Sequence, residues 1–329
     1  MKNLSIIGGG SWGTALAIIL APRFSHVKLW AYESDLAERM QQGRRNDVYL
    51  PTSEIPTNVA ITSSLEAALA EAEIVLGVMP SHLARAMYER MRPYIKPQMI
   101  FVSATKGLEN HTLLRVSEVV REVLGTDAVG VISGPSFAKE VARSEPTALV
   151  AASNDPAIAT AVQNAFSGPT FRVYTSSDPI GVEIGGSIKN VVAIGAGVLH
   201  GMGLGHNAMA ALITRGLAEM TRLAVAMGGR QQTLSGLAGL GDLVLTCTGD
   251  LSRNRTVGVE LAKGRKLDEI VSSMKMVAEG VKTTDAAVDL AKRFAVEMPI
   301  AEQMFQMLHF GSSPQEAIRR LMERSLKGE

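Results

Sequence analysis

The first half of the chain alternates short apolar runs with longer segments in which apolar positions recur at helical spacing. Largely apolar runs of this length are typical of strands buried on both faces of a parallel sheet. They cover residues 4–7, 27–31, 59–62, 74–78, 99–104, 129–133 and 147–152. The segments between them suit crossover helices and include residues 34–42, 81–91, 112–124 and 155–166. This alternation predicts an α/β fold with a mostly parallel sheet.

The pattern changes after a last predicted strand at residues 171–175. Helical patterns then follow one another at residues 180–199, 207–227, 255–263, 267–274, 283–293, 300–307 and 314–321. Asp178 followed by Pro179 resembles a helix cap and first turn. We therefore expect a sheet domain over residues 1–178 and an all-α domain over residues 179–329. The helix that begins at the boundary is expected to lie beside a cleft between them.

Three polar residues stand where predicted helices of the first half begin. Ser81 follows a proline, Asp155 precedes one, and Thr112 opens a helical pattern. The side-chain oxygen of such a residue accepts a hydrogen bond from an unpaired backbone N–H in the first helical turn. Ser81, Thr112 and Asp155 are therefore predicted N-caps.

A glycine-rich turn connects the first predicted strand to the first apolar helix, with the spacing Gly8-x-Gly10-x-x-Gly13. The first glycine permits the turn, the second allows close approach of a pyrophosphate, and the third lets the helix pack on the strand. A flexible loop would also contain glycines, but it would not require the strand before or the helix after. The sequence therefore predicts a dinucleotide site at a helix N-terminus.

The residues after the second predicted strand bear on the choice between NAD and NADP. Glu33 can accept hydrogen bonds from the adenosine ribose, which favours NAD. NADP instead needs cations for its 2′-phosphate, and Arg44 and Arg45 are candidates. Both arginines are equally compatible with a solvated loop. The sequence therefore predicts NAD or NADP without deciding between them.

Composition narrows the class of protein. A chain of 329 residues with 46% hydrophobic and 20% charged residues is typical of a globular protein of about two domains. A formal net charge of +1 gives no electrostatic case for nucleic acid. The single cysteine, Cys247, fits a reducing cytoplasm. The apolar segment 191–205 is interpreted as a buried helix and turn, so no membrane span is expected, and His200 and His206 lack metal-ligand spacing.

Several polar residues follow predicted strands, at the edge where open α/β sheets bind ligands. Lys106 lies in a tight turn after one strand and is placed for an anionic substrate. Gly134 and Ser136 follow the next strand, where backbone N–H groups and a hydroxyl can bind substrate oxygens. The alternative for Lys106 is a solvated loop lysine, and the alternative for Gly134 and Ser136 is an ordinary capped turn.

The second half adds polar residues within apolar surroundings. Lys189, followed by Asn190, lies in one of the least polar stretches, where desolvation lowers the pKa of an amine. Asp242 is placed to orient Lys189, to bind a substrate hydroxyl, or simply to cap a helix. Residues 246–255 read as a loop before a helix, and Ser252, Arg253 and Asn254 there suit a phosphate group. The alternative for Lys189 is a lysine whose charged end reaches solvent, and the alternative for residues 246–255 is a solvated basic turn.

Taken together, residues 8–14, 104–107, 133–138, 189–190, 239–242 and 252–255 closely resemble the motifs of the bacterial NAD(P)-dependent glycerol-3-phosphate dehydrogenase family, in order and over almost the whole chain. The resemblance implies a Rossmann-type domain followed by a helical domain. It also implies reversible NAD(P)H-dependent reduction of dihydroxyacetone phosphate to sn-glycerol 3-phosphate, which supplies the glycerophospholipid backbone. One departure is that Glu33 follows Tyr32 where many members have arginine or histidine, which counts against a strong NADP preference.

The resemblance also assigns residue roles. Lys189 matches the family's proton-exchanging lysine. Positions that contact substrate are matched by Lys106, Gly134, Ser136, Lys189, Asp242, Ser252, Arg253 and Asn254. The dinucleotide site is matched by Gly8, Gly10, Ser11, Trp12, Gly13, Tyr32, Tyr49, Lys106, Ala138, Arg253, Val277 and Glu279.

Two competing functions are distinguished by substrate and turnover. A β-hydroxyacid or ketopantoate-type dehydrogenase also joins a Rossmann domain to helices and uses a lysine with an asparagine. A non-catalytic dinucleotide sensor would bind the cofactor without oxidising it. The expected partner is a small-molecule substrate rather than nucleic acid, and a homodimer is left open.

Overall fold

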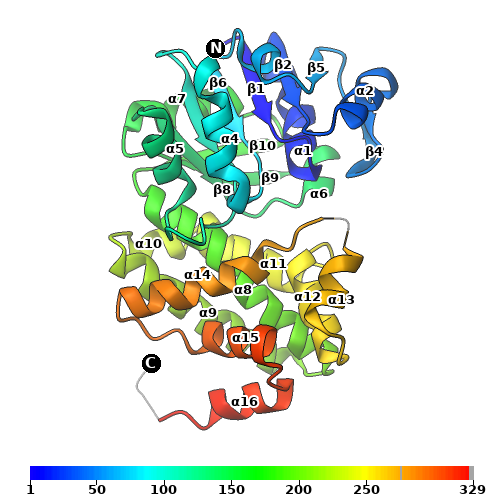
Figure 1. The fold of residues 1–329 in the computed structure, drawn as a ribbon. Helices are drawn as coiled ribbons and strands as arrows, with labels where there is room; N and C mark the ends of the chain where they lie inside the picture. Colours follow the sequence, from blue (N-terminus) through cyan, green and yellow to red (C-terminus); the bar gives the residue numbers. More distant parts are fainter. Residues whose placement is uncertain (275, 326–329) are drawn as a thin grey trace.

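The computed structural model describes residues 1–274 and 276–325. An eight-stranded sheet of order β10-β9-β8-β7-β6-β1-β2-β5 forms the upper part of the molecule, and helices form the lower part (Figure 1). Its strands are β1 (Asn3–Ile7), β2 (His26–Trp30), β5 (Val59–Thr62), β6 (Ile74–Gly77), β7 (Ile100–Ser103), β8 (Val129–Ser133), β9 (Thr147–Ala152) and β10 (Phe171–Ser176). Neighbouring strands are parallel except β8 and β9. The predicted mostly parallel sheet is confirmed.

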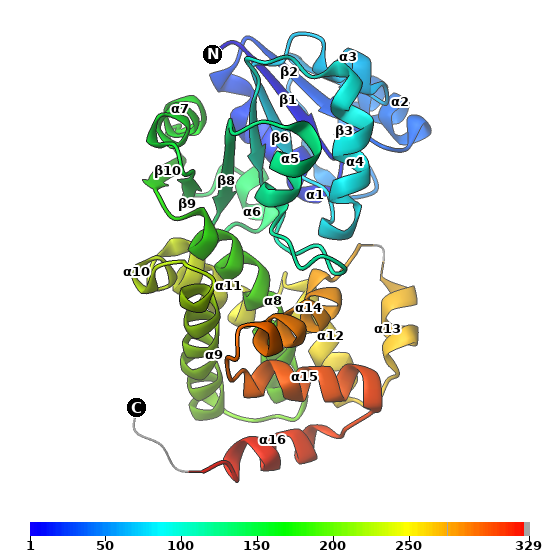
Figure 2. The same ribbon diagram turned by 60° about the vertical axis from the view of Figure 1, so that its left-hand side comes forward.

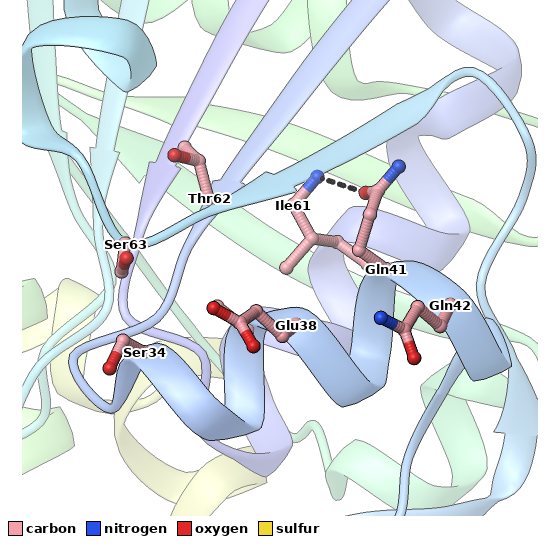
Figure 3. A pocket seen from close by; sticks show the side chains of 8 residues that line it. Ser34, Glu38, Gln41, Gln42, Ile61, Thr62 and Ser63 are labelled. Atoms are coloured by element: carbon pink, nitrogen blue, oxygen red, sulfur yellow. Dashed lines mark hydrogen bonds between the residues drawn. The ribbon is translucent and has the colours of Figure 1, made fainter.

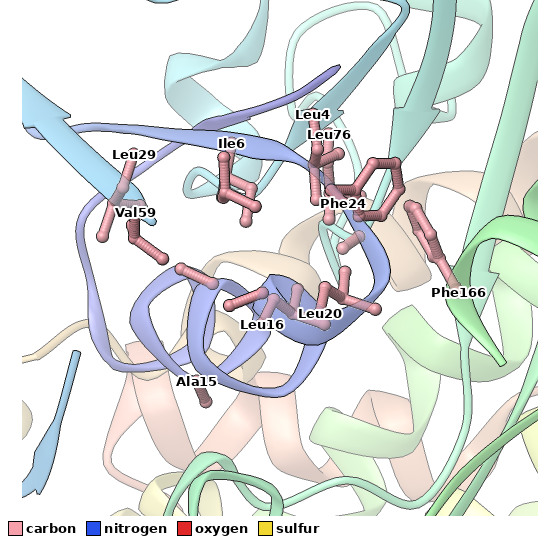
Figure 4. Close-up of a cluster of buried hydrophobic side chains, with 14 of the residues drawn as sticks. Leu4, Ile6, Ala15, Leu16, Leu20, Phe24, Leu29, Val59, Leu76 and Phe166 are labelled. Carbon is pink, nitrogen blue, oxygen red and sulfur yellow. The ribbon is translucent and has the colours of Figure 1, made fainter. Parts of the chain in front are cut away.

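Helices cover both faces of the sheet because the strands alternate apolar side chains between them. The helices are α1 (Ser11–Leu20), α2 (Ser34–Gly43), α3 (Leu65–Leu69), α4 (Ala84–Met91), α5 (Val116–Leu124), α6 (Ala138–Ala142) and α7 (Pro156–Phe166). Leu4 and Ile6 of β1 face α1, where Leu16 and Leu20 complete a buried cluster (Figure 4). Ile7 faces the opposite way, into the cluster under α3, α4 and α5. Each fully buried leucine or isoleucine contributes about 2 kcal/mol.

Two of the three predicted caps are wrong. Asp155 caps α7 by accepting from the N–H of Ala157, as predicted. Thr112 does not cap α5, because the chain first turns back at Leu113, whose φ is +63°, and the helix begins only at Val116. Ser81 begins a 3₁₀ turn, Ser81–Leu83, and its hydroxyl donates to Glu279 instead.

The chain also contains short elements that the apolar pattern did not predict. They are the antiparallel pair β3 (Arg45–Asn46) and β4 (Leu50–Glu54), together with α3 and α6. Each is too short to show a helical or strand period clearly in the sequence. The β3–β4 pair follows α2 directly and positions residues beside the glycine-rich turn.

The lower part of the molecule is helical, as predicted. It contains α8 (Pro179–Gly201), α9 (His206–Ala226), α10 (Gln231–Leu234), a π-helical segment (Leu237–Gly241), α11 (Asp242–Thr248), α12 (Arg253–Ala262), α13 (Leu267–Ser273), α14 (Glu279–Arg293), α15 (Pro299–Phe310) and α16 (Pro314–Met322). Residues 242–248 are helical, which corrects the loop expected from residue 246 onward. The predicted helical domain ends at residue 329, and residues 326–329 lie outside the described part.

Helix α8 is the central element of this helical part. By length and composition it is apolar enough to cross a bilayer, but its most apolar window is entirely buried inside the protein. It meets α12 closely, since a Cβ on Gly258 would lie 1.9 Å from the carbonyl oxygen of Ile194. Larger residues at this crossing would push the two helices apart. The apolar character of α8 therefore matches the core of a helical bundle.

The helical part lies directly below the sheet part (Figure 2), and polar and apolar contacts fix the two against each other. Leu108, from the loop after β7, is fully buried in the apolar cluster of the helical part. Glu183 of α8 accepts from the guanidinium of Arg115 at 2.7 Å and from the hydroxyl of Ser117 at 2.6 Å, at the start of α5. The buried carboxylate thereby satisfies donors at a helix N-terminus. These contacts hold α8 in place relative to the carboxyl edge of the sheet.

Candidate active site

The glycine-rich turn has room for a dinucleotide. Gly8 has a φ of +132°, and a Cβ on Gly13 would lie 1.8 Å from the carbonyl oxygen of Gly8. Only glycine is therefore compatible with this approach of α1 to the turn. Gly10, by contrast, stands at the N-cap of α1 with no atom within 4 Å of a Cβ built there. The open space above free N–H groups fits the pyrophosphate of a dinucleotide.

The buried side chain of Asn46 binds this turn through hydrogen bonds. Its amide donates to the carbonyl oxygen of Gly9 and to the hydroxyl of Thr14, both at 2.8 Å. Its own oxygen accepts from the N–H of Tyr49 at 3.0 Å. Asn46 was missed at the sequence level, because a lone asparagine in a polar loop gives no signal of such a contact.

The adenosine end of the predicted site is at the end of β2. Glu33 and Tyr32 both follow this strand, and Tyr32 is 69% exposed. The hydroxyl of Tyr49 lies 3.4 Å from a carboxylate oxygen of Glu33. Tyr32 packs edge-on against Trp30, with a centroid separation of 6.1 Å. These residues lie together, but they do not contact the lysines of the second half of the site.

The structure does not support Arg44 as a ligand for a 2′-phosphate. Its guanidinium donates to the carbonyl oxygens of Ile55, Pro56 and Val59, the last at 2.8 Å. These bonds close the loop between α2 and β5. Because its donors are directed at the protein backbone, Arg44 is interpreted as a structural residue, which corrects the sequence-based candidate.

Two lysines share one buried carboxylate at the carboxyl edge of the sheet. The Nζ atom of Lys189 lies 2.6 Å from Oδ1 of Asp242, and that of Lys106 lies 2.8 Å from Oδ2. Lys189 is 5% exposed and Asp242 is 1% exposed. Thr246 accepts a further hydrogen bond from Lys189 at 2.7 Å. The prediction that Asp242 orients Lys189 is consistent with this contact.

The pKa of Lys189 reflects two opposing influences. Burial is the larger and lowers it, the nearby charge of Lys106 lowers it further, and the Asp242 carboxylate raises it. The resulting pKa is about 8, below the ordinary value of 10.5. Lys189 can therefore exchange a proton near neutral pH.

Lys106 also joins the turn after β8 to the site. Its ammonium donates to the carbonyl oxygen of Gly134 at 2.8 Å and to the hydroxyl of Ser136 at 3.3 Å. Asn190, next to Lys189 on α8, donates to the backbone oxygen of Lys106 at 3.3 Å. The structure thus brings together the motifs after β7 and β8 with those of α8 and α11.

The start of α12 lies next to α8 and to the start of α14. Ser252 caps this helix by accepting from the N–H of Arg255. Asn254 donates to the side-chain oxygen of Asn190 at 2.9 Å and accepts from the N–H of Gly280 at 2.9 Å. Asn254 therefore connects the substrate motif of α12 to α8 and to the start of α14.

Arg253 lies on the exposed side of the same helix N-terminus. Its guanidinium donates to the carbonyl oxygen of Val277 at 2.9 Å. Glu279 accepts from the N–H of Ser81 at 3.3 Å and from its hydroxyl at 2.8 Å. This contact joins the start of α14 to the loop after β6. Ser81 was not predicted at the site, and its cap-like sequence position favoured a different interpretation.

Other candidates for the dinucleotide site lie near the glycine-rich turn. Ser11 and Trp12 form the first turn of α1, and Ala138 begins α6, which packs against α1. Trp12 and Ala138 border the same apolar cluster. A separate groove between α2 and β5 is lined by Ser34, Glu38 and Ser63 among others (Figure 3), and neither Lys106 nor Lys189 is part of its lining. We do not include this groove in the candidate active site.

Comparisons with known proteins identify the family to which the chain is similar. Residues 3–159 match the family model described as NAD-dependent glycerol-3-phosphate dehydrogenase N-terminus, and residues 178–319 match the corresponding C-terminus. Glycerol-3-phosphate dehydrogenase [NAD(P)+] of Koribacter versatilis is 56% identical, with 98% of each chain covered. The namesake from Syntrophotalea carbinolica is 53% identical, with 99% of each chain covered.

The fold has a close counterpart among solved structures. The crystal structure of glycerol-3-phosphate dehydrogenase from Coxiella burnetii matches with a TM-score of 0.94 and 44% identity. The match covers 98% of this chain and 99% of that one. Sequence and fold thus agree over nearly the full length, and the chain belongs to the NAD-dependent glycerol-3-phosphate dehydrogenase family.

Proposed function

We propose that this protein is an oxidoreductase that reduces dihydroxyacetone phosphate to sn-glycerol 3-phosphate with NADH or NADPH, and catalyses the reverse oxidation. The observation that carries the proposal is the buried Lys189 held by Asp242 beside Lys106. Family membership supports the same reaction. The product is the backbone of glycerophospholipids, which places the reaction in lipid metabolism.

In this proposal Lys189 is the catalytic acid and base. When bound, the nicotinamide supplies the hydride for the carbonyl carbon. Lys189 donates a hydrogen bond to the carbonyl oxygen and passes its proton from Nζ as negative charge develops there. In the oxidation direction neutral Lys189 accepts the proton of the substrate hydroxyl. A pKa of about 8 supports both roles, because each protonation state is populated near neutrality.

The substrate is proposed to bind between Lys189 and the start of α12. We assign Lys106, Gly134, Ser136 and Asp242 to one side of this site, and Ser252, Arg253 and Asn254 to the other. The free N–H groups of α12 and the planar guanidinium of Arg253 suit a phosphate dianion. The Lys106–Asp242 pair fixes the ammonium of Lys106 near the reacting end.

The cofactor is proposed to bind along α1 and the carboxyl edge of the sheet. The residues assigned to it are Gly8, Gly10, Ser11, Trp12, Gly13, Tyr32, Tyr49, Lys106, Ala138, Arg253, Val277 and Glu279. We propose that residues 1–178 form the dinucleotide-binding domain and residues 179–329 the substrate-binding domain. We also propose that the enzyme acts in the cytoplasm, in keeping with its single buried cysteine, and that it forms a homodimer, which light scattering would test.

A direct assay tests the reaction. Purified protein is mixed with NADH or NADPH and dihydroxyacetone phosphate, and absorbance at the nicotinamide band is followed. Oxidation of the cofactor that depends on this substrate is the expected result. Turnover of ketopantoate or a β-hydroxyacid in its place would favour the competing dehydrogenase, and binding without oxidation would indicate a sensor.

Replacing Arg253 with alanine is expected to raise the KM for dihydroxyacetone phosphate about 10- to 100-fold, because a charge-assisted contact to phosphate is lost. With the cofactor at saturating concentration, turnover of dihydroxyacetone, which lacks the phosphate, should change little. Steady-state kinetics on both ketones measures this difference. The surface variant Arg265→Ala is the matched control, since Arg265 pairs with Glu260 away from the site. Equal losses on the two ketones would contradict the assignment of Arg253 to the phosphate.

A further inference from the structure

We propose that Glu33 makes this enzyme prefer NADH to NADPH. The proposal rests on the proposed function, since it takes the glycine-rich turn as the cofactor site. What it adds is the identity of the specificity-determining residue. The position of Glu33 and the contacts of the arginines around it support this preference.

The position of Glu33 follows from the pairing of the first two strands. β1 and β2 are parallel, with Ile7 opposite Trp30, and the N–H of Gly8 donates to the carbonyl oxygen of Trp30 at 3.1 Å. The end of β2 therefore lies beside the glycine-rich turn. Glu33 follows as the N-cap residue of α2, and its side chain is exposed. In a dinucleotide fold the adenosine ribose lies at this place.

The carboxylate of Glu33 is oriented by Tyr49. The hydroxyl of Tyr49 lies 3.4 Å from Oε1 of Glu33, while its backbone N–H is held by the buried Asn46. Asn46 in turn contacts the glycine-rich turn through the carbonyl oxygen of Gly9. This chain of contacts couples Glu33 to the loop proposed to hold the pyrophosphate. A carboxylate there can accept both ribose hydroxyls of NADH, whereas a 2′-phosphate would bring like charges together.

Two of the cations that could offset such a repulsion are engaged elsewhere. Arg44 donates to three backbone carbonyl oxygens. Arg39 is held by Asp35 at 2.7 Å and by Asp47 at 3.0 Å. Arg45 stands opposite Glu54 in the register of the β3–β4 pair, and its side chain is exposed.

Arg90 also lies close to the end of β2. Its guanidinium stacks over the rings of Trp30 and Tyr32, at 5.9 and 5.8 Å from their centroids. The first turns of α2 add the carboxylates of Asp35 and of Glu38, which Figure 3 labels. The carboxylates of Glu33 and Glu38 disfavour a further dianion beside them.

Equilibrium binding tests the proposal apart from catalysis. NADH and NADPH are titrated and followed by nicotinamide fluorescence, and AMP and 2′,5′-ADP are compared by calorimetry as probes of the 2′-phosphate alone. We expect NADH to bind at least about tenfold more tightly than NADPH, with the same order for AMP over 2′,5′-ADP. The variant Glu33→Gln, which keeps the shape and removes the charge, should reduce the NADH preference about tenfold.

A matched variant separates Glu33 from the general field of α2. Glu38→Gln removes an equal charge from the same helix and should leave the NADH-to-NADPH ratio within about twofold. An equal effect of both variants would overturn the role of Glu33, as would a wild-type protein that binds NADPH as tightly as NADH. Either result leaves the proposed reaction standing, because the protein still binds and oxidises a cofactor. Failure to bind either dinucleotide would instead refute the cofactor site of the proposed function.

Discussion

Replacing Lys189 with methionine is expected to reduce kcat for ketone reduction about a thousandfold while NADH still binds. Methionine matches the length of the lysine stem and fills the buried space, but it cannot give a proton to the substrate oxygen. The glycine-rich turn is built from other residues, so the affinity for the dinucleotide should change by less than about threefold. Stopped-flow measurement of cofactor oxidation and a fluorescence titration of NADH would measure the two quantities.

The same substitution at a surface lysine provides the control for Lys189. Lys263 pairs with Glu260 at the end of α12, and Lys263→Met should retain wild-type turnover. The melting temperatures of both variants would show whether they fold. A folded Lys189→Met protein that keeps near-normal kcat would refute the assignment of Lys189 as the proton-exchanging residue.

Replacing Asp242 with asparagine is expected to have the second-largest effect, because one carboxylate compensates two lysines. The amide leaves both ammonium groups without their counter-charge, and removing one member of a buried ion pair costs about 3–5 kcal/mol. The attraction to Asp242 raises the pKa of Lys189, so its loss should move that pKa below about 8. At neutral pH the variant should reduce the ketone about a hundredfold more slowly.

The pH dependence of kcat/KM shows in which direction the loss of Asp242 moves the pKa of Lys189. Ketone reduction needs protonated Lys189, so kcat/KM for reduction in the wild type should fall as pH rises through about 8. Oxidation needs neutral Lys189 and should rise through the same range. In Asp242→Asn both midpoints should move to lower pH. Unchanged midpoints in a folded variant would contradict the electrostatic coupling between Asp242 and Lys189.

The sequence was sufficient to predict those parts of the site that depend on local structure. Gly8, Gly10 and Gly13 lie within one turn whose strand and helix flank it directly. Lys106 follows a strand, and the sheet alone determines the edge at which such residues gather. Lys189 could be identified because an amine in an apolar helix is unusual in any fold.

The contacts between these residues depend on tertiary packing and could not be read from spacing. Asp242 contacts Lys189, which is 53 positions away in the sequence, and Lys106, which is 136 positions away. Thr246 and Asn46 resemble ordinary loop residues, and their importance emerges only from the atoms they face. Arg44 illustrates the opposite case, since a basic residue in a polar loop suggested a ligand but proved to bind the backbone.

Leu108 links the position of Lys106 to the packing of the helical part. Its side chain inserts into the core of that part, two positions after Lys106 and within the same loop. The lysine that shares Asp242 with Lys189 is therefore positioned by the helical core as well as by the sheet. The geometry of the candidate site consequently depends on the packing of both parts of the molecule.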